Sequence, residues 1–229
     1  MLIERAAPLR ECTPSSRKVV LDDVQAVLAR ARLLARGGRR TILGIAGPPG
    51  GGKSTVARMV VAELGEVATL VPMDGFHLAQ AELVRIGRRD RMGAPDTFDA
   101  GGYVALLRRL RDQAEDVVYA PEFRREIEEP VAGAIAVSRS VPLVVTEGNY
   151  LLLADGDWAR VRPLLDETWY VDSDEATRVE WLIQRHVDFG KAPEAARAWV
   201  LRSDQANAEL VSATRDRADV VVRLPSLVT

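Results

Sequence analysis

The sequence predicts a three-layer α/β fold, in which helices cover both faces of a mainly parallel five-stranded sheet. Short apolar runs alternate with segments of helical periodicity, and a glycine-rich loop joins the first expected strand to a helix. No repeat, low-complexity segment or linker divides the 229 residues, so we expect one domain over 1–229. The expected strands span about 41–46, 67–72, 141–146, 167–171 and 219–223.

Four helices are expected around these strands, because apolar residues recur there at helical spacing. They run from Val24 to a stop at Gly37, from Lys53 to Gly65, over 100–114 behind an Asp99 N-cap, and from a Ser173 N-cap to near Gly190.

Two polar connections separate the expected elements, between Asp74 and Phe98 and between Val118 and Pro130. Connections of this length usually carry function or are mobile. Residues 1–20 are interpreted either as a flexible leader or as a segment that packs on the domain.

A phosphate-binding loop follows the first strand, where the sequence reads Gly-x-x-x-x-Gly-Lys-Ser. Its glycines let several backbone N–H groups converge on one point, and the following helix adds its positive N-terminal end. The lysine can reach the β- and γ-phosphates of ATP, and the serine hydroxyl can ligate Mg²⁺. The motif predicts a P-loop NTPase fold with nucleotide-binding residues Gly47, Gly50, Gly51, Gly52, Lys53, Ser54 and Thr55.

Two carboxylates follow strands of the predicted sheet. Asp74 comes after the second expected strand and Glu147 ends the third. Ligands of open parallel sheets gather at the carboxyl ends of the strands. One carboxylate can accept the proton of an attacking hydroxyl, and a second can bind or anchor a metal ion. Both residues are therefore candidates for the active site, and the alternative for each is that it caps a turn.

Arginines lie on the helix expected after the fourth strand. Arg178 and Arg185 are seven residues apart and share a face. Such a helix can close over the transferring phosphoryl group and neutralise its charge, so we expect a helical lid over about 174–200. By itself this pattern is also typical of a solvated face.

The composition limits the kinds of partner that we expect this protein to bind. The formal net charge is −2, so an excess of basic residues does not indicate nucleic acid as a partner. The beginning of the sequence lacks the long apolar segment of a signal peptide or a membrane span, which favours a cytoplasmic protein that binds no membrane. The single cysteine, Cys12, is interpreted as incidental.

Several segments together resemble the P-loop kinases of small molecules that include pantothenate kinase, uridine kinase and phosphoribulokinase. The likeness covers about 41–223. It rests on the P-loop, Asp74-Gly-Phe-His77, 91–99, 119–123, Glu147-Gly148, 199–207 and 214–222.

The resemblance implies roles for single residues. Asp74 matches the catalytic base, Glu147 the acid near Mg²⁺ and the acceptor, and Arg185 the lid arginine that contacts phosphates, beside Lys53. The expected acceptor pocket also contains His77, Arg89, Tyr119, Arg124 and Asn207. The run Phe123-Arg124-Arg125 departs from the patterns of pantothenate and uridine kinases, so the acceptor stays open between pantothenate, a nucleoside and a sugar.

The leading hypothesis is an ATP- and Mg²⁺-dependent kinase that phosphorylates a hydroxyl of a small metabolite. The resemblance also implies a homodimer, because relatives often form dimers or higher oligomers. The alternative is a nucleotide-dependent switch or ATPase that acts on a macromolecule. Against it, the sequence lacks the Asn-Lys-x-Asp and Leu-Ser-Gly-Gly-Gln signatures.

Overall fold

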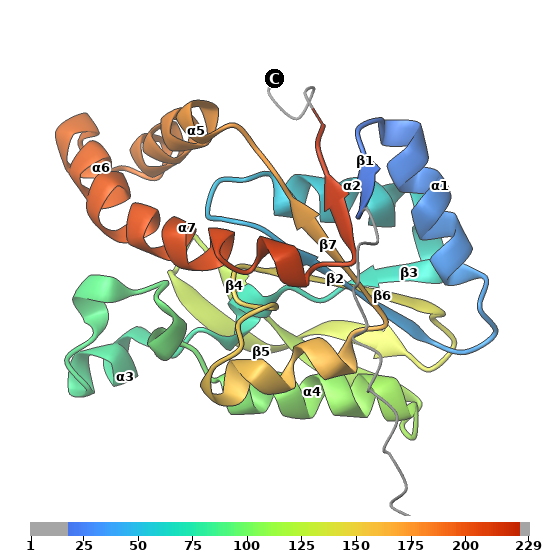
Figure 1. Ribbon diagram of the computed structural model, residues 1–229. Helices are drawn as coiled ribbons and strands as arrows, with labels where there is room; N and C mark the ends of the chain where they lie inside the picture. The colour runs from blue at the N-terminus through green and yellow to red at the C-terminus, as the bar shows by residue number, and fades with distance from the viewer. Residues whose placement is uncertain (1–17, 225–229) are drawn as a thin grey trace, which may run out of the picture.

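Six parallel strands form the main sheet of the structure, a computed structural model that describes residues 18–224. Their order is β1-β8-β7-β2-β6-β3, and helices lie on both faces (Figure 1). This arrangement confirms the predicted α/β class. The strands are β1 Val19–Leu21, β2 Thr41–Ala46, β3 Ala68–Leu70, β6 Leu143–Gly148, β7 Glu167–Val171 and β8 Val220–Val222.

The sheet has one strand more than the five predicted. All five predicted strands are present, whereas β1 was missed because it is a three-residue edge strand with two exposed valines. The expected leader of residues 1–20 therefore ends inside a strand. Residues 1–17, and with them Cys12, lie outside the described part of the chain.

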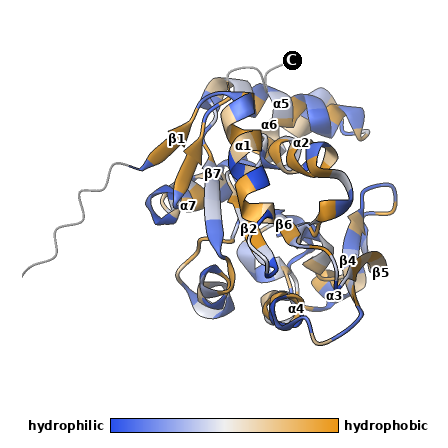
Figure 2. Cartoon of the chain, turned by 90° about the vertical axis from the view of Figure 1, so that its right-hand side faces the viewer, coloured by the Kyte–Doolittle hydropathy of each residue, from blue (hydrophilic) through white to orange (hydrophobic). Residues whose placement is uncertain are grey.

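Two apolar clusters hold the three layers together. Leu43 and Ile45 of β2 pack with α1 (Val24–Ala35) and α2 (Lys53–Leu64), whereas Ile42 and Ala46 of β2 belong to the cluster built on α4 (Ala100–Asp112). Side chains along a strand alternate between the two faces of the sheet, so one strand supplies both clusters. In Figure 2 the ribbon of α1 alternates between hydrophobic and hydrophilic residues, as expected for an amphipathic helix.

The N-caps of two helices can be compared with the residues predicted for them. Asp99 caps α4 as predicted, since its carboxylate accepts a hydrogen bond from Gly102 N at 2.7 Å. The cap predicted at Ser173 is wrong by one residue. Asp174 caps α5 (Glu175–Asp188), because its carboxylate reaches Thr177 N at 2.9 Å.

Three further helices, α3, α6 and α7, complete the helices of the described residues. One irregular stretch matters for the site: the chain from α6 to α7 passes through a π-helical turn, a feature that often marks functional sites. The helices are α3 Gln80–Arg85, α6 Pro193–Trp199 and α7 Gln205–Ser212, with the π turn at Val200–Asp204. Short 3₁₀ turns are Gly65–Val67, Met73–Phe76 (η2), Arg89–Arg91 (η3), Pro95–Thr97, Gly156–Arg160, Arg162–Leu164 and Arg215–Arg217.

The segment expected as a long polar connection at 118–130 is instead most of a β-hairpin. Strand β4 (Val117–Arg124) pairs with β5 (Glu129–Ser138), and the register shifts between Ala120 and Glu122. Such a β-bulge bends the strand and changes which side chains face inward. The polar residues of the exposed face hid the strand alternation in the sequence.

A buried arginine joins the hairpin to the main body. Arg40 is 4% exposed and donates to three backbone carbonyls: Val141 O at 3.0 Å, Leu110 O at 2.9 Å and Ser138 O at 2.5 Å. It therefore ties together the end of α4, the end of β5 and the entry to β6.

We expect Arg40→Met to lower the free energy of unfolding by about 3 kcal/mol, because it leaves buried carbonyl groups without donors. The neighbouring Arg39→Met is the control. Arg39 is largely exposed and pairs with Asp166 at 3.2 Å, so its loss should cost less than about 1 kcal/mol. Denaturant unfolding of both variants measures the difference, and equal losses would contradict the role given to Arg40.

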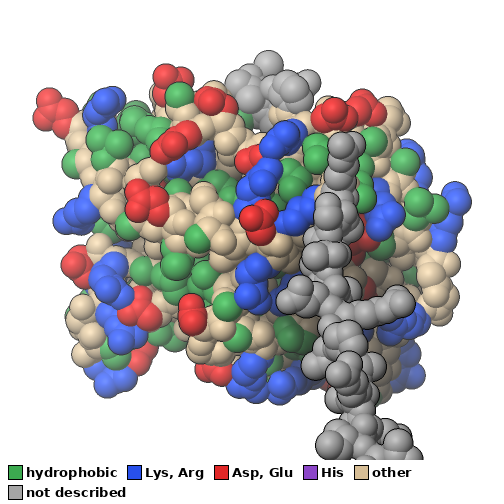
Figure 3. Space-filling model, viewed as in Figure 1, with side chains coloured by type: hydrophobic (Ala, Val, Ile, Leu, Met, Phe, Trp, Pro, Cys, Tyr) green, Lys and Arg blue, Asp and Glu red, His purple; other side chains and the backbone are tan. Residues whose placement is uncertain are grey.

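Basic and acidic side chains are interspersed on the face of the molecule shown in Figure 3. Among residues 18–224, none of the helices combines the length and the apolar character that crossing a membrane requires.

Candidate active site

The P-loop connects β2 to α2 and lies against α5, the helix predicted to belong to a lid. Gly50 has φ +74°, and a Cβ built there would lie 2.6 Å from Leu182 Cγ and 3.0 Å from Arg178 O, both on α5. A side chain at this position would be strained and would push the loop away from α5. The glycine therefore allows both the turn of the loop and its contact with the lid.

Arg178 supports the loop from the lid side. It is 3% exposed, and its Nη1 donates to Pro49 O at 3.2 Å while Nη2 donates to Gln205 Oε1 at 2.6 Å. The two arginines that share a face of the helix thus differ in environment: Arg178 binds the loop backbone, and Arg185 lies seven residues further along α5, toward its C-terminus.

Ser54 and Glu147 form the contact between the loop and the neighbouring strand. Ser54 Oγ donates to Glu147 Oε1 at 2.9 Å. Glu147 lies in β6 opposite Ile45 of β2, which brings the carboxylate beside the start of α2. Glu147 is 6% exposed, and burial raises the pKa of its carboxyl group, while the charge of Lys53 opposes this shift.

Lys53 is half-buried at the start of α2. Burial lowers the pKa of its amino group, while the carboxylates of Glu147 and Asp74 act in the opposite direction. Its Nζ lies 3.4 Å from Pro48 O, within the loop itself. The ammonium group is thus held over the concave side of the loop, where phosphates bind in P-loop proteins.

Asp74 lies in η2, which follows β3. Its side chain is 32% exposed, and its nearest cation is Arg125, whose Nη2 lies 3.6 Å from Oδ2. The hairpin packs closely on η2: a Cβ at Gly75 would lie 2.3 Å from Pro121 O. Glycine at this position therefore lets the hairpin bring Arg125 to the carboxylate.

One cavity of about 330 Å³ gathers most of the predicted catalytic and acceptor residues. They come from the P-loop, the segment after β3, the end of β6, the lid helix and α7. The predicted residues that line it are Lys53, Ser54, Asp74, His77, Arg89, Glu147, Arg185 and Asn207.

Two predicted acceptor residues do not line this cavity. Tyr119 is 58% exposed on the outer face of β4, and Arg124 is exposed near Glu122. Tyr119 precedes the bulge and lies on the exposed face of β4. The bulge between Ala120 and Glu122 explains Arg124 alone, since it shifts the alternation so that Phe123 and Arg125 line the cavity instead.

Sequence reasoning missed several residues of the cavity. Asn149 had a sequence signal, because it follows directly on Glu147-Gly148. Its Oδ1 is the one buried side-chain oxygen or nitrogen within residues 18–224 that has no hydrogen-bond partner, which suits a position that faces a ligand. Some of the others lie in segments that carry the family resemblance but were not singled out there: Pro49, Met92, Gly93, Phe98, Phe123, Trp199 and Asp204. The rest had no local signal: Arg125, Glu128, His186, Phe189 and Lys191.

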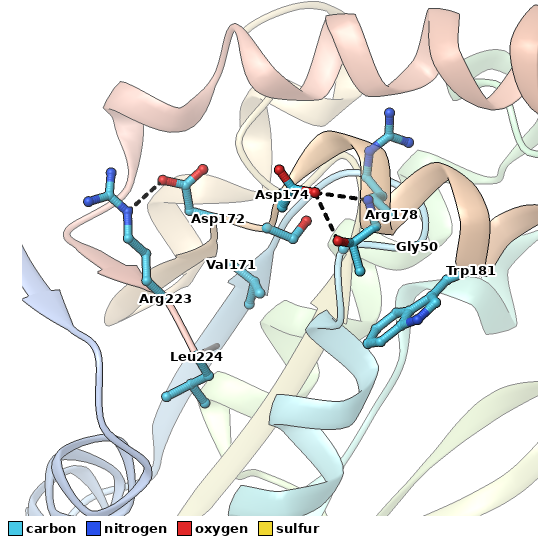
Figure 4. A pocket seen from close by; sticks show the side chains of 11 residues that line it. Gly50, Val171, Asp172, Asp174, Arg178, Trp181, Arg223 and Leu224 are labelled. Carbon is cyan, nitrogen blue, oxygen red and sulfur yellow. Dashed lines mark hydrogen bonds and ion pairs between the residues drawn. The ribbon is translucent and has the colours of Figure 1, made fainter. Parts of the chain in front are cut away.

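A second cavity, of about 350 Å³, lies on the other side of the P-loop. Gly50 lines it together with Val171, Trp181 and Leu224, as Figure 4 shows. Gly51 also belongs to the lining. At its edge Arg223 Nε donates to Asp172 at 2.9 Å. The lining is mostly apolar, as in pockets that take the flat ring of a small molecule. No local pattern in the sequence predicts this cavity.

The oxygen donors near the loop fit Mg²⁺ that arrives with a nucleotide. The described residues contain no cluster of three or more His, Cys, Asp or Glu able to hold a metal ion. Mg²⁺, however, is usually bound by one or two carboxylates and by phosphate oxygens, with water completing the octahedron. The hydroxyl of Ser54 and the carboxylate of Glu147, 2.9 Å apart, could supply the protein's share of such a site.

Fold and site together define a P-loop phosphotransferase. No protein-family model matches the chain. It is 36% identical to the ATP-dependent kinase-like protein notR' of Aspergillus versicolor, over 60% of this chain and 85% of that protein. It is 30% identical to a Schizosaccharomyces pombe protein named as a candidate uridine kinase, over 85% of this chain and 87% of that one.

A solved structure gives the same result. A Silicibacter protein named as a candidate fructose transport system kinase is 33% identical, with a TM-score of 0.77 over 85% of this chain and 98% of the other. The chain belongs to the family of P-loop small-molecule kinases that includes uridine kinase, pantothenate kinase and phosphoribulokinase.

Proposed function

We propose that the protein transfers the γ-phosphoryl group of ATP, in a Mg²⁺-dependent reaction, to a hydroxyl of a small metabolite. One observation carries the proposal: the P-loop separates two cavities, with Gly50 and Gly51 lining one and Lys53 and Ser54 lining the other. A nucleotide whose phosphates lie on the loop would place its base in the first cavity and its γ-phosphate in the second.

The residues of the second cavity suit an in-line transfer. The acceptor oxygen attacks the γ-phosphorus, the bond from that phosphorus to the β,γ-bridging oxygen breaks, and ADP leaves. Asp74 accepts the proton of the attacking hydroxyl. Lys53 and the loop amides hold the β- and γ-phosphates, and Arg185 neutralises the charge that develops on the transferred group.

Ser54 and Glu147 would hold the metal ion, which supplies charge neutralisation between the β- and γ-phosphates. The raised pKa of Glu147 fits this role, because a buried carboxylate beside a hydroxyl is stabilised by a bound cation. Arg178 acts indirectly through its bond to Pro49 O, which fixes the shape of the loop.

Membership of a small-molecule kinase family favours transfer to a metabolite over the alternative of a switch that acts on a macromolecule. The names of several relatives and structural neighbours refer to kinases of small hydroxyl compounds. They are pantothenate kinases, a candidate uridine kinase and D-glycerate 3-kinase. The predicted homodimer stays a prediction.

The test is ADP formation with ATP and Mg²⁺ in the presence of single hydroxyl compounds. The compounds are pantothenate, uridine, cytidine, fructose, ribose and glycerate. We expect one class of acceptor to stimulate ADP formation and to appear as a phosphorylated product, with Asp74→Asn as the blank. Tight ATP binding with no stimulation by any small acceptor, but stimulation by a macromolecule, would contradict the proposal.

A further inference from the structure

Besides Lys53 of the P-loop, four cations line the kinase cavity. Arg89 belongs to η3, Arg125 to the turn of the β4–β5 hairpin, and Arg185 to α5, while Lys191 follows α5. Bringing like charges together is unfavourable unless a counter-charge is present. Their convergence therefore calls for a negative partner.

These cations make few ion pairs with the four carboxylates that line the cavity. Within residues 18–224, the Arg89 guanidinium bonds only to the neutral Gln80 Oε1, at 3.0 and 2.8 Å, and the Arg185 side chain makes no hydrogen bond or ion pair. Lys191 lies over the ring of Trp199, 5.2 Å from its centroid. These cations are thus free to bind anions that enter with ligands.

The carboxylates that line the cavity are mostly engaged elsewhere. Glu147 accepts from Ser54, and Asp204 lies 3.0 Å from the ring nitrogen of His186. Glu128 is exposed at the turn of the hairpin. Asp74 is left as the partner of Arg125, at 3.6 Å, which is longer than a hydrogen bond.

Arg125 and Arg185 lie on different sides of the transfer. Arg185 comes from α5, which packs on the P-loop at Gly50 through Arg178 and Leu182, so we expect it to contact the phosphates of the nucleotide. Arg125 comes from the hairpin, which packs on η2 and so lies on the side of Asp74, where the hydroxyl must bind. Its guanidinium also lies 6.0 Å from the ring centroid of Phe189, at the end of the lid helix.

We infer that the acceptor carries a carboxylate or phosphate besides its reacting hydroxyl, and that Arg125 binds this anionic group and sets the specificity. The inference rests on the proposed kinase function. The planar fork of arginine matches both kinds of anion. The pair with Asp74 is half-exposed and weakly bound, so an incoming anion can take over the guanidinium and leave the carboxylate to the hydroxyl.

The electrostatics of the lid agree with this placement. The pKa of Arg185 is lowered, mainly by burial and then by the positive charge of Arg125. The two guanidinium groups are therefore close enough to repel each other. An acceptor anion at Arg125 and the γ-phosphate at Arg185 would relieve this repulsion, and would thereby favour closure of the lid over both substrates.

A neutral acceptor is the competing case, because the cavity also has aromatic rings. The ring of His77 packs between Phe98 and Phe123, with centroids 4.0 and 4.6 Å away. These rings already cover one another, so they form a wall more than an open stacking platform. A nucleoside that binds without help from Arg125 is accordingly an outcome that the experiment must detect.

The test compares acceptors that differ in one anionic group. The matched pairs are pantothenol and pantothenate, glycerol and glycerate, and ribose and ribose 5-phosphate. Binding is measured on protein loaded with Mg²⁺ and a non-hydrolysable ATP analogue, and turnover is measured as ADP formation with ATP. The carboxylate and phosphate pairs distinguish the two sources of the anion.

Arg125→Gln and Arg124→Gln serve as the variants, because the neighbouring Arg124 is exposed outside the cavity. We expect an anionic member to bind and turn over better than its neutral partner. Arg125→Gln should weaken its binding and raise its KM about 10- to 100-fold, the effect of losing a hydrogen bond to a charged group. Arg124→Gln should leave both unchanged.

Three results would overturn the inference: equal use of neutral and anionic members, anion binding that both variants leave intact, or binding of no anionic member to the nucleotide-loaded protein. If the ATP analogue binds and a neutral acceptor is phosphorylated, the kinase proposal stands and the anion inference alone fails. If anions bind through Arg125 but nothing is phosphorylated, the anion site stands and the kinase proposal fails.

Discussion

Replacing Asp74 by asparagine is expected to lower kcat by about 10²- to 10⁴-fold, the range for loss of a general base. Asparagine keeps the size and one oxygen of the side chain but does not accept a proton at neutral pH. Asp74 lies in the acceptor cavity, and within residues 18–224 its carboxylate makes no hydrogen bond or ion pair with the loop, so the affinity for ATP should stay nearly unchanged. Steady-state kinetics together with binding of an ATP analogue separate the two effects.

Asp90→Asn is the matched control, because Asp90 lies in η3 beside the cavity but is exposed and does not line it. It should retain full activity. Unchanged turnover in Asp74→Asn would eliminate this residue as the base. A large loss of ATP affinity would instead indicate that Asp74 acts on the nucleotide side of the transfer.

Replacing Arg185 by methionine is expected to lower kcat about 10³-fold, at the lower end of the effect of an arginine that neutralises a transferring phosphoryl group. Methionine keeps the apolar stem that packs on the lid but removes the charge. The burial of Arg185 increases the effect, because a charge acts more strongly where water is partly excluded.

The measurement is a comparison of kcat with the Kd for the ATP analogue. Arg197→Met is the control, since Arg197 is exposed on α6 within the same lid and does not line either cavity. If Arg185→Met weakens ATP binding but keeps kcat, the residue serves ground-state binding and the lid role is wrong.

The features of the active site that are local in the chain were predictable. The P-loop needs a strand, a tight turn and a helix start within about 14 residues, and all three can be recognised from neighbouring residues. Asp74 and Glu147 were found for a similar reason, because residues that follow parallel strands meet at one edge of a sheet. The structure places both in the cavity beside Lys53.

The acceptor side was predicted only in part. His77, Arg89 and Asn207 line the cavity, but Tyr119 and Arg124 do not. Their placement depends on the hairpin, whose exposed face is polar and whose bulge lies at Pro121, so strand alternation could not be followed through it. The predicted N-cap of α5 was also wrong by one position, because Asp174 and not Ser173 caps the helix.

The sequence by itself determined the fold class, the nucleotide loop and the two carboxylates, because each depends on residues close together in the chain or on the common edge of a parallel sheet. The tertiary structure alone decided that Arg125 and not Arg124 faces Asp74, that Asn149 Oδ1 is buried without a partner, and that a second cavity lies beyond the P-loop. These features arise where a hairpin, a lid helix and the loop pack together. Contacts between segments far apart in the chain depend on the packing of whole elements, which no local pattern of residues records.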